Sequence, residues 1–188
     1  MSKLETNTID NISGSSTLTI GDTNTSTIAL KSGATLTNFP DMKPITFVTL
    51  GSNQSVTDNV STVVQFDTVQ YDPESAYNSS TYRFTPQVAG RYLILADVEV
   101  ESNDYNIYYG QSQIRKNGSY TGRHNGGVFA NSVAFGFSTF GSAIFDMNGS
   151  TDYISIYGAV SSHSGTATLV FNADSKAGAF FQAFRLIG

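Results

Sequence analysis

The 188-residue sequence has no cysteine and no tryptophan, and only 13% of its residues are charged. The lack of cysteine excludes disulfides, thiolate metal sites and cysteine nucleophiles in this chain. Charged residues usually make up about a quarter of a globular protein. Ser, Thr, Asn and Gly must therefore cover most of the surface. Such a polar, uncharged and aromatic-rich composition is typical of all-β extracellular or virion proteins, not of helical cytosolic enzymes.

Basic clusters and long apolar runs are also missing. The chain has 10 Lys and Arg residues against 15 Asp and Glu, a net charge of −5, and the basic residues are scattered. Binding to nucleic acid or to an anionic membrane is therefore not expected. No apolar run approaches the roughly 20 residues of a membrane span. The start, Met1 to Thr6, lacks the apolar core of a signal peptide, which favours assembly into a virus particle over secretion.

Catalytic motifs are not found either. The two histidines, His124 and His163, are far apart in polar segments, and we expect them to be exposed loop residues instead of a catalytic pair. The sequence has no Gly-x-Ser-x-Gly nucleophile motif, no His-Glu-x-x-His zinc motif and no phosphate-binding loop. The prediction is a protein that is not an enzyme and holds no cofactor.

The first 40 residues differ in composition from the rest. They are rich in Ser and Thr, and no aromatic residue precedes Phe39. Short units that alternate polar and apolar residues recur here, separated by turn residues such as Gly21-Asp22 and Ser32-Gly33. We expect residues 1–40 to form a β-structured stalk that anchors the protein, in which three chains bury Leu18, Ile20, Ile28, Leu30 and Leu36. The alternative is a disordered Ser/Thr-rich tail.

Residues 45–188 form the predicted domain, after a stiff linker between Pro40 and Pro44. No segment has a sustained helical period. The predicted strands are 45–50, 62–69, 81–85, 90–100, 107–116, 119–123, 132–146, 152–159, 166–172 and 179–187. Asn117-Gly118 between two of them predicts a tight hairpin, because both central residues of that turn need positive φ. About ten short strands with turns between them predict an all-β sandwich of the jelly-roll type.

Some predicted strands are apolar on both faces. Leu93-Ile94-Leu95 and Phe180-Phe181 place apolar side chains at consecutive positions, whereas a sheet with one wet face would alternate. One face can fill the core of the sandwich, and the other needs a second buried surface. This pattern predicts packing against neighbouring subunits.

Two groups of polar and aromatic residues are candidate binding sites. Asp97, Glu99 and Glu101 alternate along one strand face, with Asp104 just after them. Such a row is either a solvated outer face or a weak Ca²⁺ site, since hard cations prefer several oxygen ligands. Exposed aromatic residues often contact glycans or protein receptors. The candidates for that role, in or near predicted hairpin loops, are Tyr105, Tyr108, Tyr109, Tyr120 and His124.

Several motifs of residues 45–188 resemble the globular head of C1q. They are the runs 66–72, 76–78 and 82–93, which include Phe84-Thr85-Pro86 and Gly90-Arg91-Tyr92, and the closing run 178–187. Gly149-Ser150-Thr151 before Asp152 departs from the family pattern. The resemblance implies a ten-stranded C1q/TNF-like jelly roll, a tight trimer and a binding function. Residues expected in the trimer core or sandwich core are Phe84, Tyr92, Ile94, Phe180, Phe181 and Phe184.

Residues 4–41 carry a second resemblance, to the N-terminal leader of virion proteins of marine tailed phages, notably cyanophages. Together the two resemblances imply a trimeric fibre or knob on the particle surface. Its N-terminus would attach to other capsid or tail proteins, and its head would bind a host glycan or protein. Three alternatives are a capsid decoration or head-fibre protein, a secreted bacterial C1q-like lectin, and a depolymerase, which would need a pair of acidic residues in a groove.

Overall fold

The computed structural model describes residues 44–103, 107–128, 135–163, 169–173 and 178–186, with the backbone alone at 44–45, 121–128 and 169. The predicted stalk, with Leu18, Ile20, Ile28, Leu30 and Leu36, lies outside the described residues, as do Asp104 and Tyr105. The described residues are all-β and contain no helix. A membrane-spanning helix is therefore also absent from these ranges.

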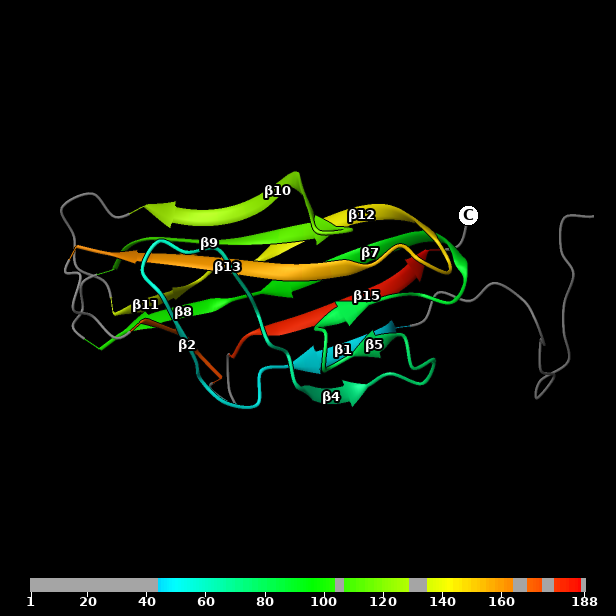
Figure 1. Ribbon diagram of the computed structural model, residues 1–188, viewed down its shortest axis with the longest axis horizontal. Coiled ribbons are helices and arrows are strands. Elements are labelled where there is room, and N and C mark those ends of the chain that lie inside the picture. The colour runs from blue at the N-terminus through cyan, green and yellow to red at the C-terminus, as the bar shows by residue number, and fades with distance from the viewer. Residues whose placement is uncertain (1–43, 104–106, 129–134, 164–168, 174–177, 187–188) are drawn as a thin grey trace, which may run out of the picture. The chain divides into compact units, whose positions relative to one another are not determined.

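Short strands follow one another along the whole described part of the chain (Figure 1). In chain order they are β1 Pro44–Thr49, β2 Gln54–Val56, β3 Thr62–Val63, β4 Thr68–Tyr71, β5 Tyr77–Asn78, β6 Arg83–Phe84, β7 Ala89–Asp97, β8 Glu99–Ser102, β9 Ile107–Lys116, β10 Ser119–Val128, β11 Gly136–Ser138, β12 Gly141–Asn148, β13 Ile154–Ser162, β14 Leu169–Phe171 and β15 Phe180–Leu186.

The strands pair antiparallel in three sheets. A five-stranded sheet has the order β12-β7-β15-β1-β4, and a six-stranded sheet has the order β10-β9-β13-β6-β5 with β3 also paired to β13. The third sheet, β11-β8-β14-β2, extends the five-stranded one, since β8 follows β7 after Val98 and β11 leads into β12. Both the amide and the hydroxyl of Thr139 donate to the carbonyl of Val98 at this junction, at 3.0 and 2.9 Å.

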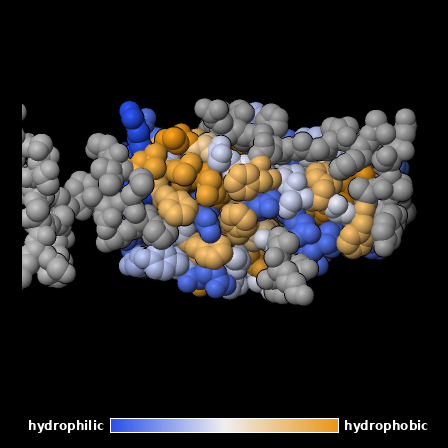
Figure 2. Space-filling model, turned by 180° about the vertical axis from the view of Figure 1, so that it is seen from behind, coloured by the Kyte–Doolittle hydropathy of each residue, from blue (hydrophilic) through white to orange (hydrophobic). Residues whose placement is uncertain are grey.

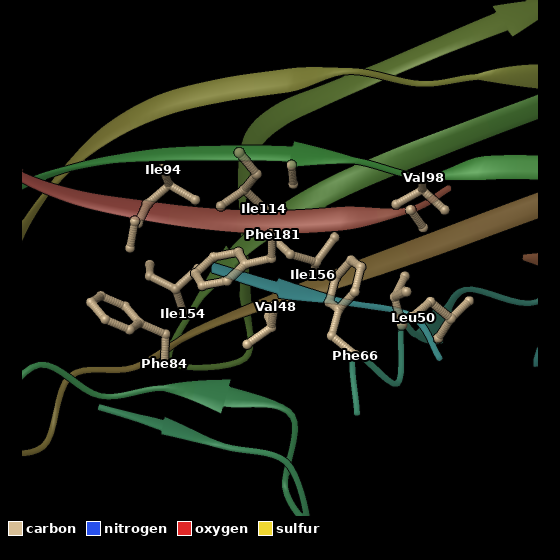
Figure 3. Close-up of a cluster of buried hydrophobic side chains, with 14 of the residues drawn as sticks. Val48, Leu50, Phe66, Phe84, Ile94, Val98, Ile114, Ile154, Ile156 and Phe181 are labelled. Carbon is tan, nitrogen blue, oxygen red and sulfur yellow. The ribbon is translucent and has the colours of Figure 1, made fainter. Parts of the chain in front are cut away.

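The core lies between the five-stranded and six-stranded sheets, and an aromatic cluster is at its centre (Figure 3). Phe181 of β15 packs against Phe84 of β6, with 5.8 Å between ring centroids, and against Tyr77 at 5.9 Å. Phe84 also meets Tyr92 edge-on at 5.7 Å. Phe84, Tyr92, Ile94 and Phe181 are essentially inaccessible to solvent. Residues from both sheets thus share one dry interior.

The predicted hairpin at Asn117-Gly118 is confirmed. These two residues have φ angles of 52° and 75° and join β9 to β10. Because glycine and asparagine tolerate the left-handed region better than other residues, the pair closes the turn with little strain. The Asn117 side chain accepts a hydrogen bond from the backbone amide of Tyr153, which connects this turn to the residue before β13.

The single strand predicted over 62–69 is wrong. The segment forms two short strands, β3 and β4, that belong to different sheets. Side-chain hydrogen bonds replace the ladder between them: the amide of Gln65 donates to Gln54 at 2.9 Å, and Asp67 accepts the amide of Gly51 at 2.7 Å. The alternation of Val64 and Phe66 into the core made the segment look like one strand. Strands β2 and β5 were not predicted, and the strand predicted over 90–100 is interrupted at Val98.

We predict that Phe181→Ala lowers the free energy of unfolding by about 3–5 kcal/mol, because it removes the ring that several core aromatics contact. Urea unfolding followed by circular dichroism measures the loss. The control variant Val60→Ala changes a side chain that is 47% exposed and is expected to change stability by less than about 0.5 kcal/mol. Equal effects of the two substitutions would contradict this assignment of the core.

Candidate functional site

The five-stranded sheet has a second apolar face, which points away from the core. Strand alternation sends Ile94 of β7 and Phe181 of β15 inward, so that their sequence neighbours point outward. Figure 2 shows hydrophobic residues gathered on the side turned away from the viewer in Figure 1. We call this the apolar face, and its residues are Phe47, Tyr71, Leu93, Leu95, Phe140, Ile144, Phe180 and Phe184.

The strand register joins these side chains into rows across the sheet. Ile144 pairs with Leu93, and Leu93 pairs with Phe184. Phe180 forms an aromatic contact with Phe47 at 6.3 Å and with Phe140 at 6.4 Å. Ile144 is 57% exposed and Phe140 is 50% exposed, although both are large and apolar. Gln182 of β15 lies among them, paired with Leu95 and with Phe47. Large apolar side chains exposed in this way are unusual on a monomer.

Polar groups border the apolar face along the strand direction. At one end Arg91 and Asp146 form an exposed ion pair at 3.2 Å. At the other end the hydroxyl of Ser138 donates to Asp97 at 2.8 Å. An apolar centre with a polar rim is the usual anatomy of a protein–protein interface. The second apolar side of these strands is therefore a defined face of the sheet, and its burial against other subunits stays a prediction.

The predicted acidic row does lie on one strand face. Asp97, Glu99 and Glu101 are half-buried and alternate with the buried Val98, Val100 and Ser102. Oδ1 of Asp97 is buried without a hydrogen-bond partner among the described residues, while Glu101 accepts a hydrogen bond from Asn172. No three acidic, histidine or cysteine side chains of the described ranges are placed to hold a metal ion. Asp104, the fourth member of the row, lies outside the described residues, and the calcium alternative stays a prediction.

The residues proposed for receptor contact have different environments. Tyr108 stacks on the exposed His163 with 4.6 Å between ring centroids, and its hydroxyl accepts from Ser161 at 3.1 Å. Tyr109 is half-buried, and this burial raises the pKa of its phenol, with a smaller contribution from Tyr120. Tyr120 is 50% exposed. The side chain of His124 and all of Tyr105 lie outside the described residues.

The six residues assigned to the trimer core or sandwich core divide into two groups. Phe84, Tyr92, Ile94 and Phe181 lie in the sandwich core, and Phe180 and Phe184 lie on the apolar face. Motif spacing could not separate the two groups, because it does not say which face of a strand is inward. The structure also adds two face residues that the sequence reasoning missed, Ile144 through the register of β12 and Phe140 through its ring contact with Phe180. The alternation along β12 was the sequence signal for Ile144.

A network of side chains ties the β9–β10 turn to the β12–β13 turn. Asp152 accepts a hydrogen bond from the side-chain amide of Asn117 at 2.8 Å and forms an ion pair with Lys116 at 2.8 Å. It also accepts the backbone amide of Asn148. The hydrogen bond from Asn117, followed by that from Lys116, holds the pKa of Asp152 below its ordinary value of 3.8. This network positions the neighbouring residues Thr151 and Tyr153.

No known protein-family profile matches the chain, and no curated protein matches it. Solved structures do. The globular domain of zebrafish complement 1qA protein is 17% identical and aligns over 77% of this chain and 98% of its own, with a TM-score of 0.54. Eiger TNF from S. frugiperda is 11% identical over 77% of this chain and 94% of its own, with a TM-score of 0.50.

The domain is a C1q/TNF-like jelly roll. The predicted fold class is thereby confirmed. At such low identity the likeness establishes the fold alone and does not extend to function. In this C1q/TNF-like domain the apolar face lies on the sheet that contains the C-terminal strand β15.

We predict that Asp152→Asn flattens the acid limb of the stability profile. Because the pKa of Asp152 is lowered in the folded state, the ionised group stabilises the fold above about pH 3.8, and this contribution is lost as the pH falls through the lowered value. Urea midpoints between pH 2.5 and 6 measure the effect. The control variant Asp146→Asn removes a carboxylate from an exposed ion pair, which contributes little. A stability difference between Asp152→Asn and the wild type that stays constant from pH 6 down to pH 2.5 would contradict the assignment.

Proposed function

We propose that the chain forms a homotrimeric, non-enzymatic recognition head on the surface of a tailed-phage particle. The apolar face carries the trimer part of this proposal. Its centre carries no charge, with Gln182 as a polar side chain among the apolar ones, and polar groups border it. Two other copies of the chain are its occupants, as the resemblance to C1q heads implies. Burying Leu93, Ile144 and Phe184 in this way removes a large apolar area from water.

Recognition is the function that this assembly serves. Three heads on one axis carry three copies of any surface site, so that weak single contacts combine into strong attachment. The predicted stalk in residues 1–40 would attach the trimer to other virion proteins. The resemblance of residues 4–41 to leaders of marine-phage virion proteins supports this placement on the particle.

A second candidate is a decoration or head-fibre protein that stabilises the particle without a specific receptor. The lightly charged surface, rich in Ser, Thr and Asn, favours it as much as it favours a receptor-binding head. A secreted bacterial lectin is the candidate of another class. A lectin of this kind would also be a trimer, but it would lie outside the virus particle. The location of the protein therefore distinguishes it from the two virion candidates.

We predict that Ile144→Glu converts the trimer to monomers at micromolar concentration. A trimer of this variant would bury three unpaired carboxylates in an apolar interface, at a cost of several kcal/mol per charge. Sedimentation velocity measures the oligomeric state, and circular dichroism checks that the domain remains folded. The side chain points outward in the monomer, so the fold itself should tolerate the change.

The matched control is Val60→Glu, which introduces the same charge at an exposed valine in the loop before β3, away from the apolar face. This variant is expected to sediment as the wild type does. A wild-type chain that is monomeric at micromolar concentration would overturn the trimer proposal. So would an Ile144→Glu variant that stays trimeric.

The location is tested with antibodies against the head and purified phage particles. Immunogold electron microscopy is expected to place the label on the tail tip or the capsid surface. Antibody fragments that block host adsorption would support the receptor-binding head, whereas unchanged adsorption by labelled particles would support the decoration protein. Particles without label, together with the protein in the medium of a bacterial culture, would support the lectin.

A further inference from the structure

A polar hollow lies on the outer side of the six-stranded sheet, near the β5–β6 hairpin and the turn before β13. Its volume of about 480 Å³ is within the range of about 300–1,000 Å³ that is usual for small-molecule sites. The apolar face belongs to the other sheet. A trimer built on that face therefore leaves this hollow open to solvent. Its lining residues include Asn78, Thr81, Arg83, Thr85, Thr151 and Tyr153.

A stacked arginine is the main charged feature of this hollow. The guanidinium of Arg83 lies 4.0 Å from the centre of the Tyr153 ring, which holds the cation in place by its electron-rich face. Among the described residues no carboxylate forms an ion pair with Arg83. The nearby Asp152 is already paired with Lys116 and Asn117. The donors of Arg83 are thus left for a ligand.

Asn78 and Thr151 present donors to the hollow, while Gln87 donates its NH₂ group to Thr85 at 3.1 Å and keeps its oxygen as an acceptor. The side-chain oxygen of Asn78 accepts the amides of Ser80 and Thr81, which leaves its NH₂ group to donate outward. The hydroxyl of Thr151 accepts a hydrogen bond from the Asn148 side chain at 2.7 Å, so its own proton can be donated to a ligand. One cation among amide and hydroxyl groups, which can donate to and accept from hydroxyls, matches a ligand with a carboxylate and several hydroxyl groups.

The positive charge is notable because the chain as a whole carries a net charge of −5. None of the ten lining residues is Asp, Glu, His or Cys. The hollow therefore lacks the paired carboxylates that glycoside hydrolysis requires. Its chemistry is that of binding without cleavage.

We propose that this hollow binds an acidic saccharide, a sugar unit that carries a carboxylate. The Arg83 guanidinium binds the carboxylate through two parallel N–H hydrogen bonds, the geometry that its planar shape favours. Asn78, Thr81 and Thr151 donate to the ring hydroxyl oxygens. This inference rests on the proposed recognition function and names its ligand class. It does not depend on whether the head is carried by the tail or the capsid.

The test titrates the full chain with trisaccharides of galacturonate, glucuronate and N-acetylneuraminate, each paired with its neutral methyl ester. Ligand-observed NMR measures binding. We expect at least one acid to bind at millimolar concentration or below, and its ester to bind at least tenfold more weakly, since the charge-assisted hydrogen bonds are lost. Equal binding of acid and ester would overturn the proposal. So would the failure of all three acids.

Two variants make the test specific. Arg83→Gln is expected to weaken binding at least tenfold, and Arg83→Lys to weaken it less, because a point charge replaces the planar fork. The matched control is Arg115→Gln, since Arg115 also stacks on a tyrosine, 3.8 Å from the ring centre of Tyr157, but outside the hollow. Its binding is expected to stay within twofold of the wild type. A loss in Arg115→Gln equal to that in Arg83→Gln would overturn the site.

Two further measurements distinguish a saccharide site from a general anion site and from an effect on assembly. Inorganic phosphate and acetate compete in the same titration, and displacement by phosphate as strong as by the saccharide would replace the proposal with a general anion site. Sedimentation of Arg83→Gln reports assembly independently of binding. A trimer that binds no acidic saccharide would overturn this inference alone, and a saccharide-binding monomer would overturn only the trimer proposal.

Discussion

The packing of Phe181 between the two sheets is the contact on which the rest of the domain depends. Its ring meets Phe84 and Tyr77 from the β5–β6 hairpin and Phe66 from the loop before β4. This contact sets the inward side of β15, and the period of two along a strand then sets the outward side. Phe180 and Phe184 must therefore face away from the core. A register slip of one residue would exchange the two faces.

The same inward packing places the hollow on the other sheet. Because Phe84 points into the core from β6, its neighbour Arg83 must point outward, next to Tyr153 at the start of β13. The Asp152 network holds the turn from which Tyr153 projects. One layer of core contacts thus orients both the apolar face and the polar hollow, on opposite sheets. The proposed assembly and the proposed recognition therefore do not compete for surface.

The sequence was sufficient for the fold class, and its physical signals were local. Asn117-Gly118 predicted the hairpin because few residue pairs tolerate two positive φ angles in succession. Consecutive apolar residues at 93–95 and 180–181 indicated that a strand has two apolar faces. The strand over 62–69 was predicted wrongly because the backbone pairing with β13 ends at Val64, whose amide donates to Ile156 at 2.9 Å, whereas the alternation into the core continues to Phe66. Core burial and strand pairing are different constraints. The alternation of apolar residues along the sequence indicates which side chains are buried, but not which strands pair.

The order of residues along the chain determined the all-β class, the hairpin turn and the presence of apolar residues on both faces of some strands, since each of these depends on near neighbours. Only the tertiary structure decided which side chains share the apolar face. Ile144, Leu93 and Phe184 come from three strands and meet through register. Arg83 and Tyr153 are 70 residues apart by number, and only the pairing of β6 with β13 brings them together. Long-range pairing is set by the energy of the whole core, which no local window of the sequence contains.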